Sequence, residues 1–147
     1  MANPLDDALQ RYIKFYETLT PQTLDSINDV FASDARFRDP FNDARGTAHI
    51  RKIFADMFKT VGAPDFTITS YGWSAGYTRQ AFLRWKFIYR VGGKGEPVTV
   101  EGMSDVLFDE SGKVASHLDF WDAAGGLYEH LPVIGGILRF IRKKIES

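Results

Sequence analysis

In the first part of the chain, apolar side chains recur every three or four positions in three stretches, as in amphipathic helices. The first stretch starts at Asn3-Pro4, where an asparagine N-cap precedes proline at the first helical position. The second starts at Thr20-Pro21 and is shorter. The third starts at Thr47 and ends at Gly62, a residue common just past a helix. The three apolar stripes are Leu9, Tyr12, Ile13, Tyr16 and Leu19; Leu24, Ile27, Val30 and Phe31; and Ile50, Ile53, Phe54, Met57, Phe58 and Val61.

From Asp65 onward the apolar period changes to two, which is typical of β-strands. A short extended segment is also predicted just before Asp39-Pro40. Helices followed by a run of strands predict an α+β domain, with the helices on one face of a curved sheet. The four predicted strands are joined by short, glycine-containing turns, so neighbours should pair antiparallel. They span residues 66–73, 79–91, 97–108 and 114–122.

After Gly125-Gly126 the pattern changes again. Residues 127–147 are predicted to be helical, with isoleucines along one side, basic residues on the rest and a break at Gly135-Gly136. We therefore divide the chain into a domain over residues 1–124 and a C-terminal extension over 125–147. The extension is expected to pack on its own domain or on a partner subunit, and membrane contact is not expected.

Composition narrows the possible functions. The chain has 147 residues, 14% of them aromatic, and a formal net charge of −1. This charge balance gives no reason to expect a nucleic-acid partner. Cysteine is absent, which excludes disulfides, thiolate catalysis and cysteine-ligated metals. The N-terminus is acidic, unlike a signal peptide, and the apolar run over 131–141 is too short for a membrane span, so a cytoplasmic protein is expected.

Two distant segments carry residues suited to proton chemistry. Asp39 ends a predicted strand at a turn. His117, Asp119 and Trp121 alternate along the last strand, so they share one of its faces. On the pattern alone that face is solvated, and the leucine and phenylalanine between these residues point into the core.

Several segments resemble the SnoaL-like, ketosteroid-isomerase-like superfamily, whose fold is shared with nuclear transport factor two. They are residues 31–40 (FASDARFRDP), 46–51 (GTAHIR), 100–102 (VEG), 112–114 (GKV) and 119–122 (DFWD). The resemblance spans roughly residues 5–122. It implies a cone-shaped, cystatin-like fold: three N-terminal helices on a strongly curved, mostly antiparallel sheet, around an apolar pocket.

The resemblance turns His117, Asp119 and Trp121 into that pocket. Leu118 and Phe120 then lie on the outer face of the sheet and need a cover. A homodimer formed through this outer face is expected, and the C-terminal helix is the other possible cover.

The resemblance also implies roles for the polar residues. Asp39 occupies the position of the general base of the isomerases. Tyr12 or Tyr16 occupies that of the tyrosine that donates to the substrate oxygen. Asp119 is expected to orient His117, which would act as acid or base.

The second donor of the isomerases is a protonated aspartic acid. A gap-free alignment puts Ser104 at that position, with Asp105 beside it. Adjacent strand residues face opposite ways, so Asp105 enters the pocket only if a bulge shifts the register. Which of the two faces the pocket stays open at this point.

We expect the protein to bind a small apolar or amphipathic molecule. The pocket should be lined by Trp121, Ser104, Trp85, Phe87, Phe54 and Phe58. The leading hypothesis is an enzyme without a cofactor that isomerises, cyclises or dehydrates this molecule by general acid–base catalysis. No metal site is expected, because no motif has metal-ligand spacing. The alternative is a non-catalytic ligand-binding or dimerisation domain of the same fold.

Overall fold

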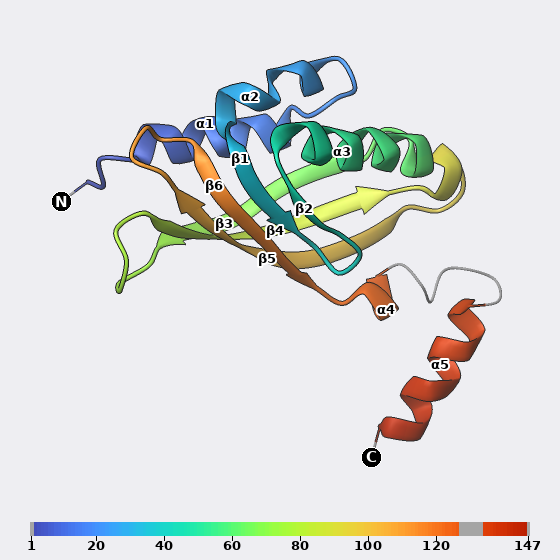
Figure 1. Cartoon of the computed structure of the whole chain (residues 1–147). Coiled ribbons are helices and arrows are strands. Elements are labelled where there is room, and N and C mark those ends of the chain that lie inside the picture. Colours follow the sequence, from blue (N-terminus) through green and yellow to red (C-terminus); the bar gives the residue numbers. More distant parts are fainter. Residues whose placement is uncertain (1, 127–133, 147) are drawn as a thin grey trace.

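The computed structural model describes residues 2–126 and 134–146 (Figure 1). The helical elements are α1 (Asp6–Glu17), η1 (Thr23–Ser26), α2 (Ile27–Val30), α3 (Thr47–Val61), η2 (Val91–Gly93), α4 (Ala123–Gly126) and α5 (Ile134–Ile145). The strands are β1 (Phe31–Arg38), β2 (Asp43–Arg45), β3 (Asp65–Trp73), β4 (Gln80–Tyr89), β5 (Val98–Phe108) and β6 (Val114–Trp121).

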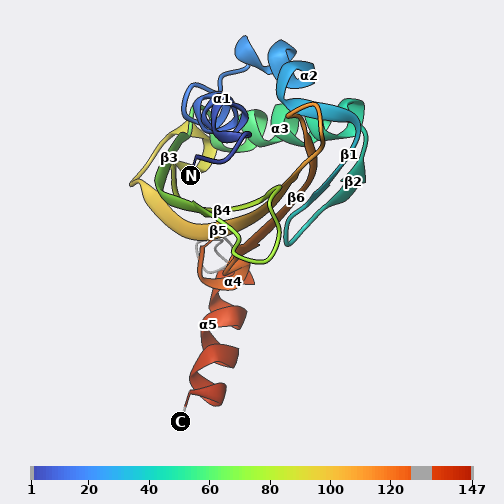
Figure 2. The same cartoon turned by 90° about the vertical axis from the view of Figure 1, so that its left-hand side faces the viewer.

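All six strands form one sheet in the order β2-β1-β6-β5-β4-β3. The pair β1–β6 is parallel and the other pairs are antiparallel. Figure 2 shows the sheet curling around one side of α1 and α3, which cover its concave face. This is the expected α+β cone, and the predicted meander β3-β4-β5-β6 is confirmed.

The chain departs from the prediction around residues 24–45. The predicted second helix is only a 3-10 turn followed by the four residues of α2. Phe31 already belongs to β1, which has eight residues. An irregularity in the β1–β6 pairing between Phe31 and Arg36 breaks the period-two pattern, so this strand was hard to detect from the sequence. Strand β2 was not predicted, because its three residues carry no apolar alternation.

Helix α1 closes the concave side of the sheet. It carries Asp6 and Asp7 in its first turn and Lys14 in its last turn, which suits the helix dipole. Its apolar face is buried, and Tyr12 meets the rings of Phe31 and Phe108 edge to face. Burial of such side chains contributes about 1.5–3 kcal/mol each. The helix therefore holds its two inner tyrosines in fixed positions above the sheet.

The outer face of the sheet keeps exposed apolar side chains. Phe120 on β6 is 62% exposed and lies directly opposite Met103 of β5, which is 49% exposed. The prediction that a second subunit covers this face stays a prediction.

The C-terminal helix α5 lies apart from the cone in Figures 1 and 2. Its side chains Phe140 and Ile145 are exposed. Gly135 and Gly136 lie within α5, so the described helix continues through the position of the predicted break. The predicted helical residues 127–133 lie outside the described residues. Within residues 2–126 and 134–146, no helix is long and apolar enough to cross a membrane.

Candidate active site

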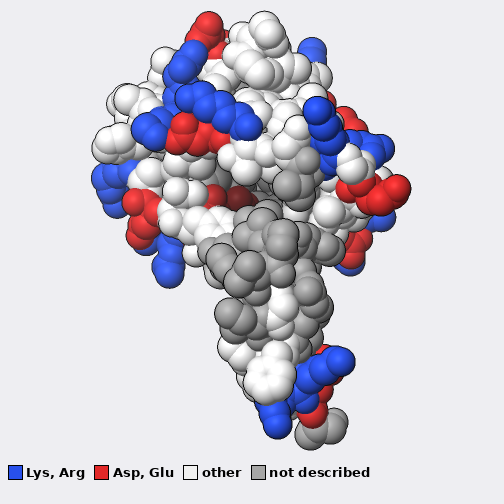
Figure 3. All heavy atoms as spheres, turned by 90° about the vertical axis from the view of Figure 1, so that its right-hand side faces the viewer, with Lys and Arg blue, Asp and Glu red and all other residues white. Residues whose placement is uncertain are grey.

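A cavity of about 840 Å³ lies between the helices and the concave face of the sheet. Most of its wall is apolar. The polar side chains include Tyr16, Ser104, His117 and Asp119, with Asp39 and Asn42 on another part of the wall. Figure 3 shows a hollow in the surface of the cone, and atoms of acidic residues are visible inside it. A cavity of this size and lining suits a small, largely apolar molecule.

His117 points into the cone, as the resemblance implied. Its side chain is 3% exposed, and its ring stacks on that of Phe37 with 5.0 Å between the centroids. Its Nε2 lies 2.6 Å from Oδ1 of Asp119, two residues further along the same face of β6. Its Nδ1 lies 2.6 Å from the hydroxyl of Tyr12. Both ring nitrogens therefore have a hydrogen-bond partner inside the protein.

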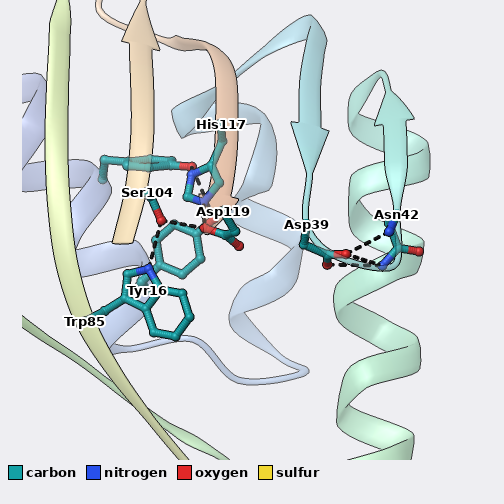
Figure 4. Close-up of polar contacts among 8 residues, drawn as sticks. Tyr16, Asp39, Asn42, Trp85, Ser104, His117 and Asp119 are labelled. Atoms are coloured by element: carbon teal, nitrogen blue, oxygen red, sulfur yellow. Dashed lines mark hydrogen bonds and ion pairs between the residues drawn. The ribbon is translucent and has the colours of Figure 1, made fainter. Parts of the chain in front are cut away.

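Asp119 is held by side chains from two strands (Figure 4). The Ser104 hydroxyl donates to Asp119 Oδ1 at 2.5 Å, and these two residues are direct neighbours across β5 and β6. The indole Nε1–H of Trp85 on β4 donates to Ser104 Oγ at 2.8 Å. All hydrogen bonds to Asp119 go to Oδ1, and none of the described residues donates to Oδ2. Since Asp119 lines the cavity, Oδ2 is available to a bound molecule.

The register settles the choice between Ser104 and Asp105. Ser104 is 2% exposed and lines the cavity. Asp105 faces the other way and accepts a hydrogen bond from Gln80 at 2.8 Å. No bulge intervenes at this point, because β4 and β5 pair without interruption.

A glycine makes room for Trp85. Gly102 of β5 pairs with Trp85, and a methyl group built on Gly102 would lie 2.4 Å from two carbons of the indole ring. Such a distance is far inside van der Waals contact. The indole ring therefore lies across β5 at a position where only glycine leaves room for it, and its Nε1–H reaches Ser104 from there.

The two tyrosines of α1 have different positions. They lie one turn apart, and their hydroxyls are 3.1 Å from each other. Tyr16 lines the cavity, whereas Tyr12 is 1% exposed and lies behind it, next to His117. Of the two tyrosines considered as the substrate's hydrogen-bond donor, the structure therefore places Tyr16 at the cavity.

Both hydroxyls stay protonated at ordinary pH. Burial raises the pKa of Tyr16 well above the usual value of 10, and the negative charge of Asp119 adds to this effect. Burial likewise raises the pKa of Tyr12 well above 10, with Tyr16 and Asp119 contributing in the same direction. Each hydroxyl thus carries one proton to donate, which limits the hydrogen-bond patterns available here.

Asp39 lines the cavity but is bound within its own turn. Its Oδ1 accepts from the backbone N–H groups of Phe41 and Asn42, both at 2.8 Å, and from the Asn42 side-chain amide at 3.0 Å. Its Oδ2 accepts from the same amide at 3.1 Å. Figure 4 shows the carboxylate pointing toward Asn42. Aspartate commonly caps its own turn in this way, and the part played by Asn42 was not predicted from the sequence.

Five of the six predicted pocket residues line the cavity: Trp121, Ser104, Trp85, Phe87 and Phe54. The prediction for Phe58 was wrong, because this side chain lines a smaller hollow beside Tyr16 and Phe66. Phe54, Met57 and Val61 lie along the inner face of α3, and Phe58 follows Met57 by one residue, or 100° around the helix.

Among the described residues, no group of three His, Asp or Glu side chains is placed to hold a metal ion.

The sequence profile of the SnoaL-like domain matches residues 12–117 of the chain. No curated protein matches the sequence at a significant level. Solved structures show the same fold at low sequence identity. A LEH-like epoxide hydrolase of M. tuberculosis is 14% identical, with a TM-score of 0.65 over 95% of this chain and 96% of its own.

Two further structures are similar over most of their length. A candidate SnoaL-like polyketide cyclase from Jannaschia sp. CCS1 is 9% identical, with a TM-score of 0.72 over 85% of this chain and 92% of its own. A protein from Catenulispora acidiphila with a ketosteroid isomerase-like fold, crystallised with trimethylamine, is 14% identical, with a TM-score of 0.69 over 83% and 90%. At these identities the likeness concerns the fold alone.

Proposed function

The chain belongs to the SnoaL-like family, and we propose that it is a cofactor-independent acid–base enzyme acting on a small, largely apolar molecule that carries a carbonyl or a related oxygen group. The observation that carries this proposal is the arrangement of Asp119. One of its oxygens is fixed by Ser104 and His117, and the other is free at the wall of an apolar cavity.

Such a carboxylate is suited to proton transfer. The two donors to Oδ1 fix the orientation of the group, so Oδ2 does not have to reorganise when it takes up a proton. The apolar wall would place a substrate C–H beside Oδ2 with little water present. Asp119 would remove a proton next to the carbonyl group and return it at another position, as an isomerisation or a cyclisation requires.

The other polar groups would support this step. Tyr16 lines the same cavity and is linked through Tyr12 to His117, so its hydroxyl would meet a substrate oxygen. His117 would orient Asp119 through Nε2, and both of its ring nitrogens already have hydrogen-bond partners inside the protein. Asp39 is occupied by the donors of its turn, so we assign proton transfer to Asp119 instead of Asp39.

The proposal is tested by hydrogen–deuterium exchange at the α-carbon of ketones in D₂O, followed by mass spectrometry. Exchange at this carbon reports proton transfer for any ketone that binds. The panel contains cyclododecanone, 2-tetralone and a β,γ-unsaturated cyclic ketone. We expect the protein to accelerate exchange in at least one of them. Asp119→Asn should lower the rate by about a hundredfold or more, as expected for loss of a general base.

Asp105→Asn is the matched control, because it makes the same chemical change on the outer face of the neighbouring strand β5, one residue after Ser104. It should leave the exchange rate unchanged. If the ketones bind and no member of the panel exchanges faster than in buffer, the enzyme proposal fails and the non-catalytic binding domain is the better description. Equal rates for wild type and Asp119→Asn would remove Asp119 as the base.

A further inference from the structure

The two buried tyrosines and His117 form one continuous hydrogen-bond chain that ends at the cavity. Tyr16 at the cavity wall is 3.1 Å from Tyr12, and Tyr12 is 2.6 Å from Nδ1 of His117. Tyr12 does not line the cavity, so its hydroxyl only connects the other two groups. Each hydroxyl has a single proton, so the direction of one hydrogen bond in the chain fixes the direction of the next.

When the imidazole is neutral, the hydrogen bonds of the Tyr16–Tyr12–His117 chain are donated in the direction of His117. Asp119 Oδ1 is an acceptor, so the single ring proton lies on Nε2 and points at it. Nδ1 is then a lone pair and accepts from Tyr12, and the oxygen of Tyr12 accepts from Tyr16. The proton of Tyr16 is thus used inside the protein. Only lone pairs of Tyr16 face the cavity in this state, and they can accept a hydrogen bond but not donate one.

When the imidazole is protonated, the same hydrogen bonds are donated in the opposite direction, away from His117. Both ring nitrogens now donate, and Nδ1–H points at the oxygen of Tyr12. Tyr12 must turn its own proton toward Tyr16. The proton of Tyr16 is released from the chain and can be donated to a molecule in the cavity.

We infer that the protonation state of His117, transmitted through Tyr12, decides whether Tyr16 accepts from or donates to the bound molecule. Some ligand oxygens can only accept a hydrogen bond, as in a ketone, an epoxide or an enolate. Binding of such a ligand requires His117 to carry one additional proton. An alcohol can both donate and accept, so it fits either state. Tyr12 is a positioning residue in this scheme. The inference rests on the proposed function only in that the ligand occupies this cavity.

Other charged or titratable groups also face the cavity and must be separated from His117 in the test. They are Asp39 after β1, Asp43 and Arg45 of β2, His49, Lys52 and Asp56 of α3, Tyr89 of β4, and Asp119 of β6. Among the described residues, only Tyr12 and Asp119 are hydrogen-bonded to the His117 ring. A pH effect that passes through the chain must therefore depend on Tyr12.

The test measures the affinity of cyclododecanone and of cyclododecanol by calorimetry between pH 8 and pH 5. The ketone requires the protonated state, so its affinity should rise as the pH falls, by at most tenfold per pH unit. The affinity should become constant once His117 is fully protonated. The alcohol has the same ring and should change by less than about twofold across this range.

Tyr12→Phe cuts the chain while keeping Tyr16 and His117. The proton of Tyr16 then has no partner inside the protein and is free to be donated at every pH. The variant should therefore bind the ketone at pH 8 more tightly than the wild type does, with little dependence on pH. Tyr71→Phe is the matched control, because Tyr71 is 52% exposed and is hydrogen-bonded to Gln10 outside this chain. It should behave as the wild type.

An unchanged pH dependence of ketone binding in Tyr12→Phe would overturn the inference. A second measurement needs no variant and no ligand: ¹⁵N spectra of labelled histidine in the wild type should show His117 protonated at Nε2 in its neutral form. A neutral ring protonated at Nδ1 would overturn the inference even if Tyr12→Phe failed to fold. If neither probe bound, the ¹⁵N spectra would still decide the direction of the hydrogen-bond chain, and the other ketones of the panel would still decide the proposed function.

Discussion

Asp39 and Asp119 face the same cavity, and their surroundings differ in kind. Asp39 receives all its hydrogen bonds from the next three residues of the chain. Asp119 receives one from β5, and its other partner, His117, is linked to α1. The hydrogen bonds to the Asp39 carboxylate come from a local turn, whereas those around Asp119 form only when the strands and α1 are assembled.

This difference bears on the choice of the acid–base group. A carboxylate whose lone pairs are filled by its own turn serves the structure, because a substrate would have to compete with those donors. A carboxylate with one fixed and one free oxygen combines orientation with access. At the position that the family resemblance marks for the base, the carboxylate of Asp39 is held by donors of its own turn, which is why we propose proton transfer at Asp119 instead.

The largest effect we predict concerns the two tyrosines linked to the His117–Asp119 pair. It is a loss of folding stability at high pH. The pKa values of Tyr12 and Tyr16 are raised well above 10 in the folded protein, whereas tyrosine in the unfolded chain ionises near 10. Above that pH the unfolded state loses these protons and the folded state keeps them. The free energy of unfolding should therefore fall as the pH rises from about 10, by up to about 1.4 kcal/mol per pH unit for each buried tyrosine.

Urea unfolding between pH 9 and pH 11.5 measures this dependence. In Tyr16→Phe the free energy of unfolding should fall less steeply with pH, by the contribution of one tyrosine. This holds whatever the substitution does to stability at neutral pH. Tyr71→Phe should leave the slope unchanged, because that side chain is exposed. Equal slopes in wild type and Tyr16→Phe would show that Tyr16 is not held in its neutral form by burial.

A smaller effect is predicted for the glycine beneath Trp85. In Gly102→Ala the new methyl group would overlap the indole ring, so the ring must move and lose its hydrogen bond to Ser104. Overpacking of this kind costs about 1–3 kcal/mol. We expect a loss of stability in this range by urea unfolding, together with slower ketone exchange, because Ser104 would no longer be fixed against Asp119.

Gly76→Ala is the matched control for this change. Gly76 lies in the turn between β3 and β4, and the nearest atom to an added methyl group there is Ser74 Oγ at 3.9 Å. Its stability and exchange rate should stay close to wild type. If Gly102→Ala were as mild as Gly76→Ala, the position of Trp85 would not depend on the missing side chain.

The sequence predicted most of the fold and the inward face of β6, for reasons that differ between elements. The long helices and the hairpins have strong periodic patterns, and the resemblance decided which face of β6 lies inside. Strand β2 escaped prediction because its pairing with β1 depends on the turn at Asp39 and not on its own composition.

The site was less predictable because it depends on contacts between distant residues. The sequence places Tyr12 and Tyr16 on one face of a helix, and only the packing of α1 on the sheet shows which of them reaches the cavity. The link from Trp85 through Ser104 to Asp119 joins three strands, so no local pattern could reveal it. The same applies to the free oxygen of Asp119, on which the proposed chemistry depends.

The smallest effect should come from the Asp39 turn. Asn42→Ala removes the side-chain amide that contacts both oxygens of Asp39 and keeps the two backbone donors. Because this turn is partly exposed, the lost hydrogen bonds should cost about 1 kcal/mol of stability in urea unfolding. If Asp39 only shapes the turn, ketone exchange should change by less than about threefold, which corresponds to under about 0.7 kcal/mol in the barrier. Exchange that became much faster or slower in Asn42→Ala would bring Asp39 back as a participant in the chemistry, because freeing its oxygens would then have altered the reaction itself.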